Sequence, residues 1–394
     1  MFNNLISLTD LQLFSNELID IGMYSFSHMK SLITLILGKN QIERLNAQTF
    51  DGLFALESLF LSQNKINEMD IEAFHGMPNV LTLYLDYNKV KTIKMGLLGN
   101  LKKLTYVTLS FNQISRLEIN SSSLREVYLS NNLIREVNAR TFSQSFNMNW
   151  LDLSENRIVS ITPNSFDALT QLVLLNLSHN SLDGLNEKTF AQLIKLKTLD
   201  LSFNYIKILG SQFLSHLTSL DQLYLNSNQM REIEVDSFRD LVNLEILNLE
   251  FNLLTKFASR LFQSMSHLRQ LLLKGNSIAS LNDLKANLNF AENLERLDVA
   301  LNRIEMIKEA DFEFNSHLKY VDLSQNSIRA LHPKALQNLS CLETLKLAHS
   351  SLPYLDLDIV GFNTNLQELD LSFNNISWNK VFSIKIKNIY SLIK

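Results

Sequence analysis

The chain has 394 residues, of which 46% are hydrophobic and only 10 are Gly and 4 are Pro, so it is neither disordered nor collagen-like and can bury a large core. Its formal net charge of -4 and pI near 6.1 provide no basic excess, which argues against nucleic acid or an anionic membrane surface as its main partner. No apolar run approaches the ~18 to 20 residues that a membrane span needs, and a single cysteine, Cys341, excludes an intrachain disulfide.

One nine-residue phrase, LxxLxLxxN, recurs from the start of the chain to residue 374. The copies are 24 residues apart, except for one spacing of 20 from Asn112 to Asn132 and one of 26 from Asn276 to Asn302. Such a fixed period indicates stacked structural repeats and overrides the two or three domains that length alone would suggest. The sixteen final positions of the phrase, which we call the ladder positions, are Asn16, Asn40, Asn64, Asn88, Asn112, Asn132, Asn156, Asn180, Asn204, Asn228, Asn252, Asn276, Asn302, Asn326, Ser350 and Asn374.

Each period predicts one coil of a spiral. In the LxL segment, as around Asp200, apolar and polar residues alternate as in a strand with one buried face, and we expect neighbouring coils to pair these strands in parallel. At the following turn the ladder Asn can donate to and accept from backbone groups that lack partners, whereas Ser350, with its shorter reach, predicts a looser rung. Ten residues after the ladder position a Phe recurs and fills the wider side of the coil: Phe26, Phe50, Phe74, Phe142, Phe166, Phe190, Phe238, Phe262 and Phe312.

The chain opens inside a repeat. Phe2, Leu5 and Leu8 occupy positions of a coil whose ladder residue would precede Met1. The first residues also lack the basic segment and apolar core of a secretory signal peptide. We therefore expect the sequence to be a fragment or an incomplete gene product.

Two coils and the C-terminal tail depart from the period. The segment RLEINSSSLREVYLSNN is four residues short and lacks the Phe, which predicts a local pinch of the outer side. The coil that follows Asn276 has two extra residues, and Leu284 and Leu288, at i and i+4, predict a helical turn in it. We predict about sixteen coils over residues 1–376 and a basic, out-of-register tail over 377–394, which contains Lys380, Lys385, Lys387 and Lys394.

The form LxxLxLxxNxIxxIxxxxFxxLxxL resembles the typical repeat class of animal extracellular leucine-rich repeat proteins, among them chaoptin-like adhesion proteins, Toll-like receptor ectodomains and slit-like ligands. The resemblance runs from Phe2 to about Asn375 and is specific for the fold rather than for one member. It implies an α/β solenoid, a leucine-rich repeat horseshoe with a parallel concave β-sheet and a convex face of short helical and irregular segments. The cysteine-rich caps, signal peptide and membrane anchor of such proteins are not recognisable in this sequence.

No motif predicts catalysis, a cofactor or a metal site. A glycine-rich phosphate loop, a nucleophile elbow and an HExxH motif do not occur. Cys341 directly precedes the strand residue Leu342, and we interpret it as a small packed residue. The histidines have neither metal-ligand spacing nor a neighbouring cysteine pair: they are His28, His75, His179, His216, His267, His317, His332 and His349.

Four Asn-x-Ser sequons predict N-glycosylation in an extracellular protein, at Asn120, Asn176, Asn338 and Asn375. Some are expected by chance in a sequence this rich in Asn and Ser, and a cytosolic chain could carry all four unmodified. Together with the repeat class, they favour an extracellular or cell-surface location. Asn176 lies between two strand leucines, so a glycan there would project from the concave sheet.

The outward-facing positions of the concave strands are predominantly acidic and, over five consecutive coils, aromatic. The ten acids are Asp10, Asp86, Glu126, Asp152, Asp200, Glu250, Asp298, Asp322, Glu368 and Asp370, against the three bases Lys274, Arg296 and Lys346. The aromatic run is Phe60, Tyr84, Tyr106, Tyr128 and Trp150. Tyr and Trp are frequent interface hot spots, although a repeat-family habit for Asp and simple covering of the sheet by rings are alternative explanations. We predict that the five rings with Asp86, Glu126 and Asp152 dock a basic protein surface.

The function predicted from these observations is non-catalytic binding of a protein ligand, or of a second copy of the chain, in adhesion or receptor-type recognition. Nucleic acid binding and direct membrane insertion are not expected. A secreted carrier or regulatory subunit is one alternative. An intracellular scaffold is another, and an unglycosylated cytosolic protein would favour it.

Overall fold

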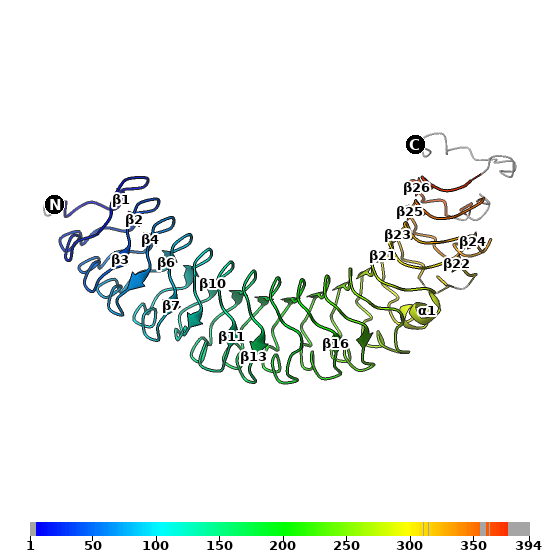
Figure 1. Ribbon diagram of the computed structural model, residues 1–394, viewed down its shortest axis with the longest axis horizontal. Helices are drawn as coiled ribbons and strands as arrows, with labels where there is room; N and C mark the ends of the chain where they lie inside the picture. The colour runs from blue at the N-terminus through cyan, green and yellow to red at the C-terminus, as the bar shows by residue number, and fades with distance from the viewer. Residues whose placement is uncertain (1–4, 310, 314, 355–359, 362, 377–394) are drawn as a thin grey trace. The chain divides into compact units, whose positions relative to one another are not determined.

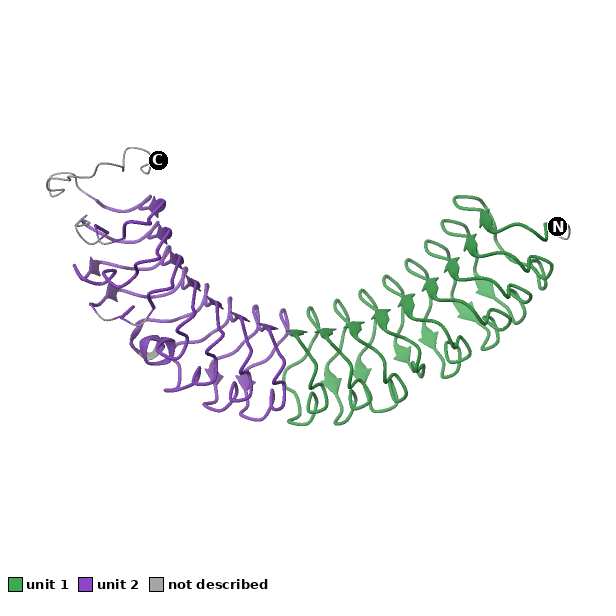
Figure 2. Ribbon diagram, turned by 180° about the vertical axis from the view of Figure 1, so that it is seen from behind, with its two compact units in different colours: residues 1–199 green, residues 200–394 purple. Residues whose placement is uncertain are grey.

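The computed structural model describes residues 5–309, 311–313, 315–354, 360–361 and 363–376. The chain forms two compact units, unit 1 over residues 1–199 and unit 2 over residues 200–394, which Figure 2 colours separately. Phe2 and the predicted tail, 377–394, lie outside the described residues. No helix in the described ranges is long and apolar enough to cross a membrane.

Each unit is a stack of coils that contributes one three-residue strand per coil to a parallel sheet (Figure 1). In unit 1 the strands are β1 (Asp10–Gln12), β2 (Thr34–Ile36), β4 (Ser58–Phe60), β6 (Thr82–Tyr84), β8 (Tyr106–Thr108), β10 (Glu126–Tyr128), β12 (Trp150–Asp152) and β14 (Leu174–Asn176). In unit 2 they are β17 (Gln222–Tyr224), β19 (Ile246–Asn248), β20 (Gln270–Leu272), β21 (Arg296–Asp298), β23 (Tyr320–Asp322), β25 (Thr344–Lys346) and β26 (Glu368–Asp370). Strand β15 (Thr198–Asp200) contains the last residue of unit 1 and the first of unit 2.

The strands pair in register, so each residue faces its counterpart one repeat away. Leu35 pairs with Leu59, for example, and Leu59 with Leu83. These central residues are fully buried, whereas the residues on either side of them are half-buried or exposed. The predicted period-two alternation and parallel pairing are therefore confirmed.

The ladder asparagines bond the coils as predicted. The Asn64 amide donates to the carbonyl of Leu61 in its own coil and to that of Leu37 in the preceding coil, both at 3.0 Å. Its Oδ1 accepts the N–H of Ile42 at 3.1 Å. Ser350 does not reproduce this pattern, because its buried Oγ has no hydrogen-bond partner among the described residues. The sequence predicts a weaker hydrogen-bonded link at Ser350, and the structure shows no hydrogen bond from its side chain to any described residue.

The return side of the coils is spaced more widely than the strand side. Buried Phe rings stack coil on coil, with centroids 6.2 Å apart between Phe26 and Phe50 in unit 1 and between Phe238 and Phe262 in unit 2. Paired strands are only ~4.8 Å apart. Each unit consequently bends with its sheet on the inner side (Figure 2).

The outer side contains more strand and less helix than the prediction of short helical and irregular segments suggested. Two-residue strands pair in parallel there, β3 with β5, β7 with β9, β11 with β13, β16 with β18 and β22 with β24. Their bounds are Arg44–Leu45, Glu68–Met69, Thr92–Ile93, Arg116–Leu117, Glu136–Val137, Ser160–Ile161, Ile208–Leu209, Glu232–Ile233, Met306–Ile307 and Ala330–Leu331. Within the described ranges, α1 (Asn282–Leu288) is the one helix. It lies in the long coil, as predicted, and its residues Leu284 and Leu288 are buried.

Candidate functional site

The five predicted aromatic residues form one continuous row on the sheet of unit 1. Phe60 and Tyr84 stack at 4.4 Å between ring centroids. From Tyr84 the row passes to Tyr106 at 5.4 Å, to Tyr128 at 5.4 Å and to Trp150 at 6.1 Å, with tilted rings. The structure therefore brings all five predicted rings together.

Phe60 pairs in register with Tyr84, and from Tyr84 on the row runs in a zigzag because its members alternate between two strand positions. Tyr84 and Tyr128 are the third residues of their strands, whereas Tyr106 and Trp150 are the first. Tyr106 pairs in register with Thr82 rather than with Tyr84, so successive rings meet on the diagonal. The row thus covers the full width of the strands over five coils.

Most of the rings are half-buried by their neighbours, and Trp150, at 38%, is the exposed end. The mutual contact agrees with the simpler role of covering the sheet. It also holds the rings rigid, which lowers the entropy that a partner must overcome on docking. The two roles are compatible, since each ring still presents part of its surface.

The three predicted acids of the site differ in how far burial and hydrogen bonds engage their carboxyl groups. Asp86 accepts the N–H of Ser110 at 3.0 Å and a hydrogen bond from the Thr108 hydroxyl. Burial raises the pKa of its carboxyl, although these hydrogen bonds oppose the shift. Asp86 therefore mainly ties its coil to the next one, which weakens its predicted role as a steering charge.

Glu126 and Asp152 lie beside the exposed end of the row. Glu126 pairs in register with Trp150, and Asp152 pairs with Tyr128. The Tyr128 hydroxyl donates to Glu126 at 3.2 Å. Burial, followed by the negative charge of Glu126 and this hydrogen bond, raises the pKa of Tyr128 to about 12. The phenol therefore stays neutral at physiological pH, and both carboxylates are in position to meet a cation that approaches the rings.

In unit 2, one predicted outward-facing acid proves to be buried. Asp298 is only 6% exposed, and burial raises the pKa of its carboxyl to about 6. Its Oδ1 accepts the N–H of Ala300 at 3.1 Å, and Arg296 lies 3.9 Å away. Asp298 is therefore not a freely accessible steering charge, contrary to the prediction.

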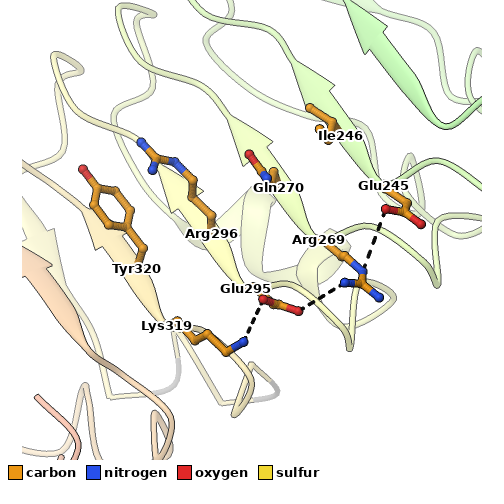
Figure 3. A pocket seen from close by; sticks show the side chains of 8 residues that line it. All are labelled: Glu245, Ile246, Arg269, Gln270, Glu295, Arg296, Lys319 and Tyr320. Atoms are coloured by element: carbon orange, nitrogen blue, oxygen red, sulfur yellow. Dashed lines mark hydrogen bonds and ion pairs between the residues drawn. The ribbon is translucent and has the colours of Figure 1, made fainter. Parts of the chain in front are cut away.

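A hollow of about 330 Å³ lies along β19, β20, β21 and β23 of unit 2 (Figure 3). Along it, Arg269 lies 4.0 Å from Glu245 and 3.8 Å from Glu295, and Lys319 bonds Glu295 at 2.9 Å. The Arg296 guanidinium stacks over the Tyr320 ring at 4.0 Å. The charges in this row compensate one another, so they stabilise the coil stack only weakly and leave little unpaired charge for a ligand.

The predicted glycosylation sites are scattered and differ in accessibility. Asn338 and Asn375 are exposed, whereas Asn120 is half-buried and accepts the Ser143 hydroxyl at 2.8 Å. Asn176 ends β14 and is half-buried, with its Oδ1 accepting the N–H of Ser178 at 3.0 Å. A glycan there would stand one strand beyond Trp150, because β14 pairs with β12.

The described residues contain no group of three or more His, Cys, Asp or Glu that could hold a metal. Surface histidines make local contacts, as between the His267 ring and the carbonyl of Val242 at 3.0 Å. Cys341 is half-buried rather than fully packed. No arrangement for acid, base or nucleophilic chemistry emerges from these contacts.

Sequence reasoning missed an exposed aromatic pair beside the row. Tyr87 and Phe111 directly precede the ladder residues Asn88 and Asn112, and their rings stack at 4.3 Å while remaining 52% and 42% exposed. The signal was present, since an aromatic residue precedes the ladder Asn in two consecutive coils. Strand alternation does not cover these residues, because they lie past the ends of the strands.

The profile of the leucine-rich repeat family matches the chain over residues 6–66, 55–114, 122–182, 170–230, 223–278 and 292–352. A second leucine-rich repeat profile matches residues 365–385. No curated protein sequence matches the chain.

Solved structures resemble the chain over most of its length. A structure of the Toll–Spatzle complex from Drosophila matches with a TM-score of 0.79 and 25% identity, covering 92% of this chain and 50% of that chain. The chain therefore spans about half the length of that match. FLRT2, in an octameric complex with Latrophilin 3 and Unc5D, matches with a TM-score of 0.57 and 26% identity, covering 71% and 78%. A leucine-rich repeat protein of Leptospira interrogans, at 23% identity and a TM-score of 0.68, covers 96% and 93% and supports the fold alone.

Proposed function

The chain belongs to the leucine-rich repeat family, and we propose that it serves as a non-catalytic, extracellular or cell-surface scaffold for adhesion or receptor-type recognition of a protein. The fold supports a protein-binding role, because the sheet of each unit presents rows of half-exposed side chains along its strands. The Toll and FLRT2 structures are of complexes with other proteins. These partners are those of Toll and FLRT2. For this chain, the two complexes support only the proposal that its ligand is a protein.

The observation that carries the proposal is the continuous aromatic row from Phe60 to Trp150 in unit 1. Rigid rings provide a large contact area at little entropic cost. Glu126 and Asp152, beside the exposed end, favour a partner surface with Lys or Arg near its contact residues. A basic protein surface is the docking partner that these groups fit best.

The experiment replaces one ring of the row and a matched ring outside it. Tyr128 and Tyr224 are both third strand residues, and each donates its hydroxyl to the first residue of its own strand, Glu126 at 3.2 Å and Gln222 at 3.1 Å. Replacing either residue therefore removes the same kind of side chain from the same strand position. A partner is first captured with a photo-crosslinking residue at position 174, which pairs with Trp150 on the next strand and lies outside the row, and its affinity for each variant is then measured by biolayer interferometry.

We expect Tyr128→Ala and Trp150→Ala to weaken binding by about 30-fold, the equivalent of a hot spot of about 2 kcal/mol. Tyr224→Ala should leave the affinity unchanged. Equal affinities of all three variants, with intact circular dichroism spectra, would exclude the aromatic row as the docking site.

The extracellular location is tested separately through the sequons. Expression in a secretory pathway followed by glycosidase treatment should produce a mass shift that Asn338→Gln and Asn375→Gln reduce, since both side chains are exposed. An unglycosylated native protein in the cytosol would instead favour the intracellular scaffold. Concentration-dependent self-association in analytical ultracentrifugation would identify a homophilic partner, and a native form without membrane attachment would favour the secreted carrier.

A further inference from the structure

A second surface lies beside the aromatic row, past the C-terminal ends of the unit 1 strands. We name it the rim patch and define it as Lys39, Lys65, Tyr87, Lys89, Lys91 and Phe111. Lys39, Tyr87 and Phe111 directly precede ladder asparagines, Lys65 and Lys89 directly follow them, and Lys91 follows two residues later. All six side chains are exposed.

The rim patch is basic, because its six members include four lysines and no acid. Between Asp86 and Glu118 the sequence has no acidic residue. No ion pair within the described ranges involves any of the four lysines of the patch. Of the nearby acids, Glu68 pairs with Arg44 at 3.3 Å, and Asp70, which lines the same hollow as Lys91, accepts the N–H of Glu72 at 2.9 Å.

The aromatic pair at the centre of the patch is not required by the fold. Tyr87 and Phe111 have φ angles of 54° and 55°, in the left-handed region that bulky residues rarely adopt. This conformation costs roughly 1–2 kcal/mol for a residue with a side chain. The same position, also with positive φ, holds Ser15, Gln63 and Gly275 in some coils. In others it holds Phe203, Phe251 and Phe373. The two rings thus combine exposed apolar surface with an unfavourable backbone conformation, and the core gains nothing from them.

We propose that the rim patch is a second docking surface, which binds a short acidic segment of a protein partner that also carries apolar side chains. The lysines supply the complementary charge, and the Tyr87–Phe111 stack supplies the apolar contact. The partner is then dipolar, with a basic surface on the aromatic row and an acidic segment on the rim patch, and this opposition of charges fixes its orientation. That last step rests on the proposed function, whereas the rim patch itself does not.

A short protein segment fits the patch better than a long polyanion. Glu126 and Asp152 lie on the adjoining sheet of the same unit, and they would repel a nucleic acid strand or sulfated glycan that continued across the strands. A short acidic peptide can end at the rim and avoid them.

The test measures the fluorescence anisotropy of a short labelled peptide of Glu and Leu as it binds the full chain. Heparin and single-stranded DNA serve as alternative polyanions. The test variant is Lys89→Gln with Lys91→Gln. Its matched control is Lys102→Gln with Lys103→Gln, which removes the same charge from the same coil. These two lysines precede β8, at the opposite edge of the sheet, and bond the Gly99 carbonyl and Asn79 Oδ1, both at 2.7 Å.

We expect salt-sensitive peptide binding that weakens about tenfold in the Lys89/Lys91 variant and changes less than twofold, roughly, in the control. Tyr87→Ser should also weaken it, because the ring contact is lost. Absence of peptide binding to the native chain, or equal losses in both double variants, would overturn the proposal. Patch-dependent binding of heparin or DNA without peptide binding would overturn it in favour of that polyanion.

These experiments test the two proposed docking surfaces independently of each other. Tyr128→Ala and Trp150→Ala should leave the binding of the acidic peptide unchanged, since neither ring belongs to the rim patch. The Lys89/Lys91 variant, in turn, leaves the aromatic row intact. A result against one surface therefore does not decide the other.

Discussion

Replacing Ser350 by Asn should restore the one interrupted rung of the ladder and stabilise the chain. The neighbouring rung gives the template: the Asn326 amide donates to the carbonyls of Leu323 and Val299, both at 2.9 Å, and its Oδ1 accepts the N–H of Ile304 at 2.9 Å. At Ser350 the buried Oγ makes no hydrogen bond within the described part of the chain.

The size of the gain follows from the groups that would be satisfied. One repeat after Ile304, the N–H of the buried Ile328 has no acceptor among the described residues. An Asn at position 350 would supply that acceptor and would donate to the carbonyls of Leu347 and Leu323. Each carbonyl already accepts one ladder amide and has a second lone pair. Satisfying a buried group is worth about 1 to 3 kcal/mol, and ordering the longer side chain offsets part of this.

The assay combines a urea titration followed by circular dichroism with hydrogen exchange of the Ile328 amide. The Ser350→Asn chain should unfold at higher urea, and exchange at Ile328 should slow, while exchange at Ile304 serves as the internal reference. Ser350→Ala is the matched control and should cost almost nothing, because the hydroxyl it removes is unpaired. If Ser350→Asn has an unchanged midpoint and unchanged protection at Ile328, the reasoning about the missing rung is refuted.

Three further predictions concern single residues. Asn204→Ala should lower the free energy of unfolding by about 1 to 3 kcal/mol in the same titration, because the Asn204 amide donates to the carbonyls of Leu201 and Ser202 at 3.1 Å. A decrease as small as that of Ser350→Ala would contradict this prediction. Leu301→Asn should raise the free energy of unfolding by about 1 kcal/mol, since Leu301 is exposed at a φ of 54° that Asn adopts readily. Asp298→Asn should stabilise the chain at pH 7 by on the order of 1 to 3 kcal/mol. Burial raises the folded-state pKa of Asp298 to about 6 from 3.8. Between pH 3.8 and 6 the folded state therefore keeps a proton on Asp298 that the unfolded state has lost. The native chain therefore gains stability as the pH falls from 6 to 4, and the advantage of the variant should shrink over that range; a pH-independent difference would show that Asp298 does not titrate there.

The repeat fold could be predicted in detail because each of its structural roles is tied to one residue type at a fixed spacing. The ladder Asn is identifiable from sequence because no other side chain donates and accepts with that reach. The helix in the long coil was predictable from Leu284 and Leu288. The two-residue outer strands were not, because a strand such as Arg44–Leu45 has no period of its own and forms only where the next coil brings Glu68–Met69 beside it.

The candidate site was predictable in position but not in electrostatics. Strand alternation placed all five rings correctly, since it depends only on the backbone. The same rule called Asp298 outward-facing and charged, but alternation says nothing of the neighbours that cover a side chain. Burial there follows from Arg296 in the same strand and from the adjoining strand β23, whose Asp322 pairs with Asp298. Whether a carboxyl group is charged depends on how far neighbouring side chains bury it, and those neighbours come from coils that are distant in sequence.

Both proposed surfaces occupy positions that the fold leaves open. The core fixes the central strand residue, the ladder Asn and the Phe of each coil, but the residue after the ladder Asn, and the first and third strand residues where they are not buried, accept almost any side chain. Tyr128 and Lys89 stand at such positions, and so do Gln222 and Ser181 in other coils. Substitutions there change binding chemistry at little cost in stability, because surface replacements away from packed groups alter the unfolding free energy by only about 0.5 kcal/mol. A repeat stack can therefore acquire a second docking surface of opposite charge beside the first without disturbing the coils that carry both.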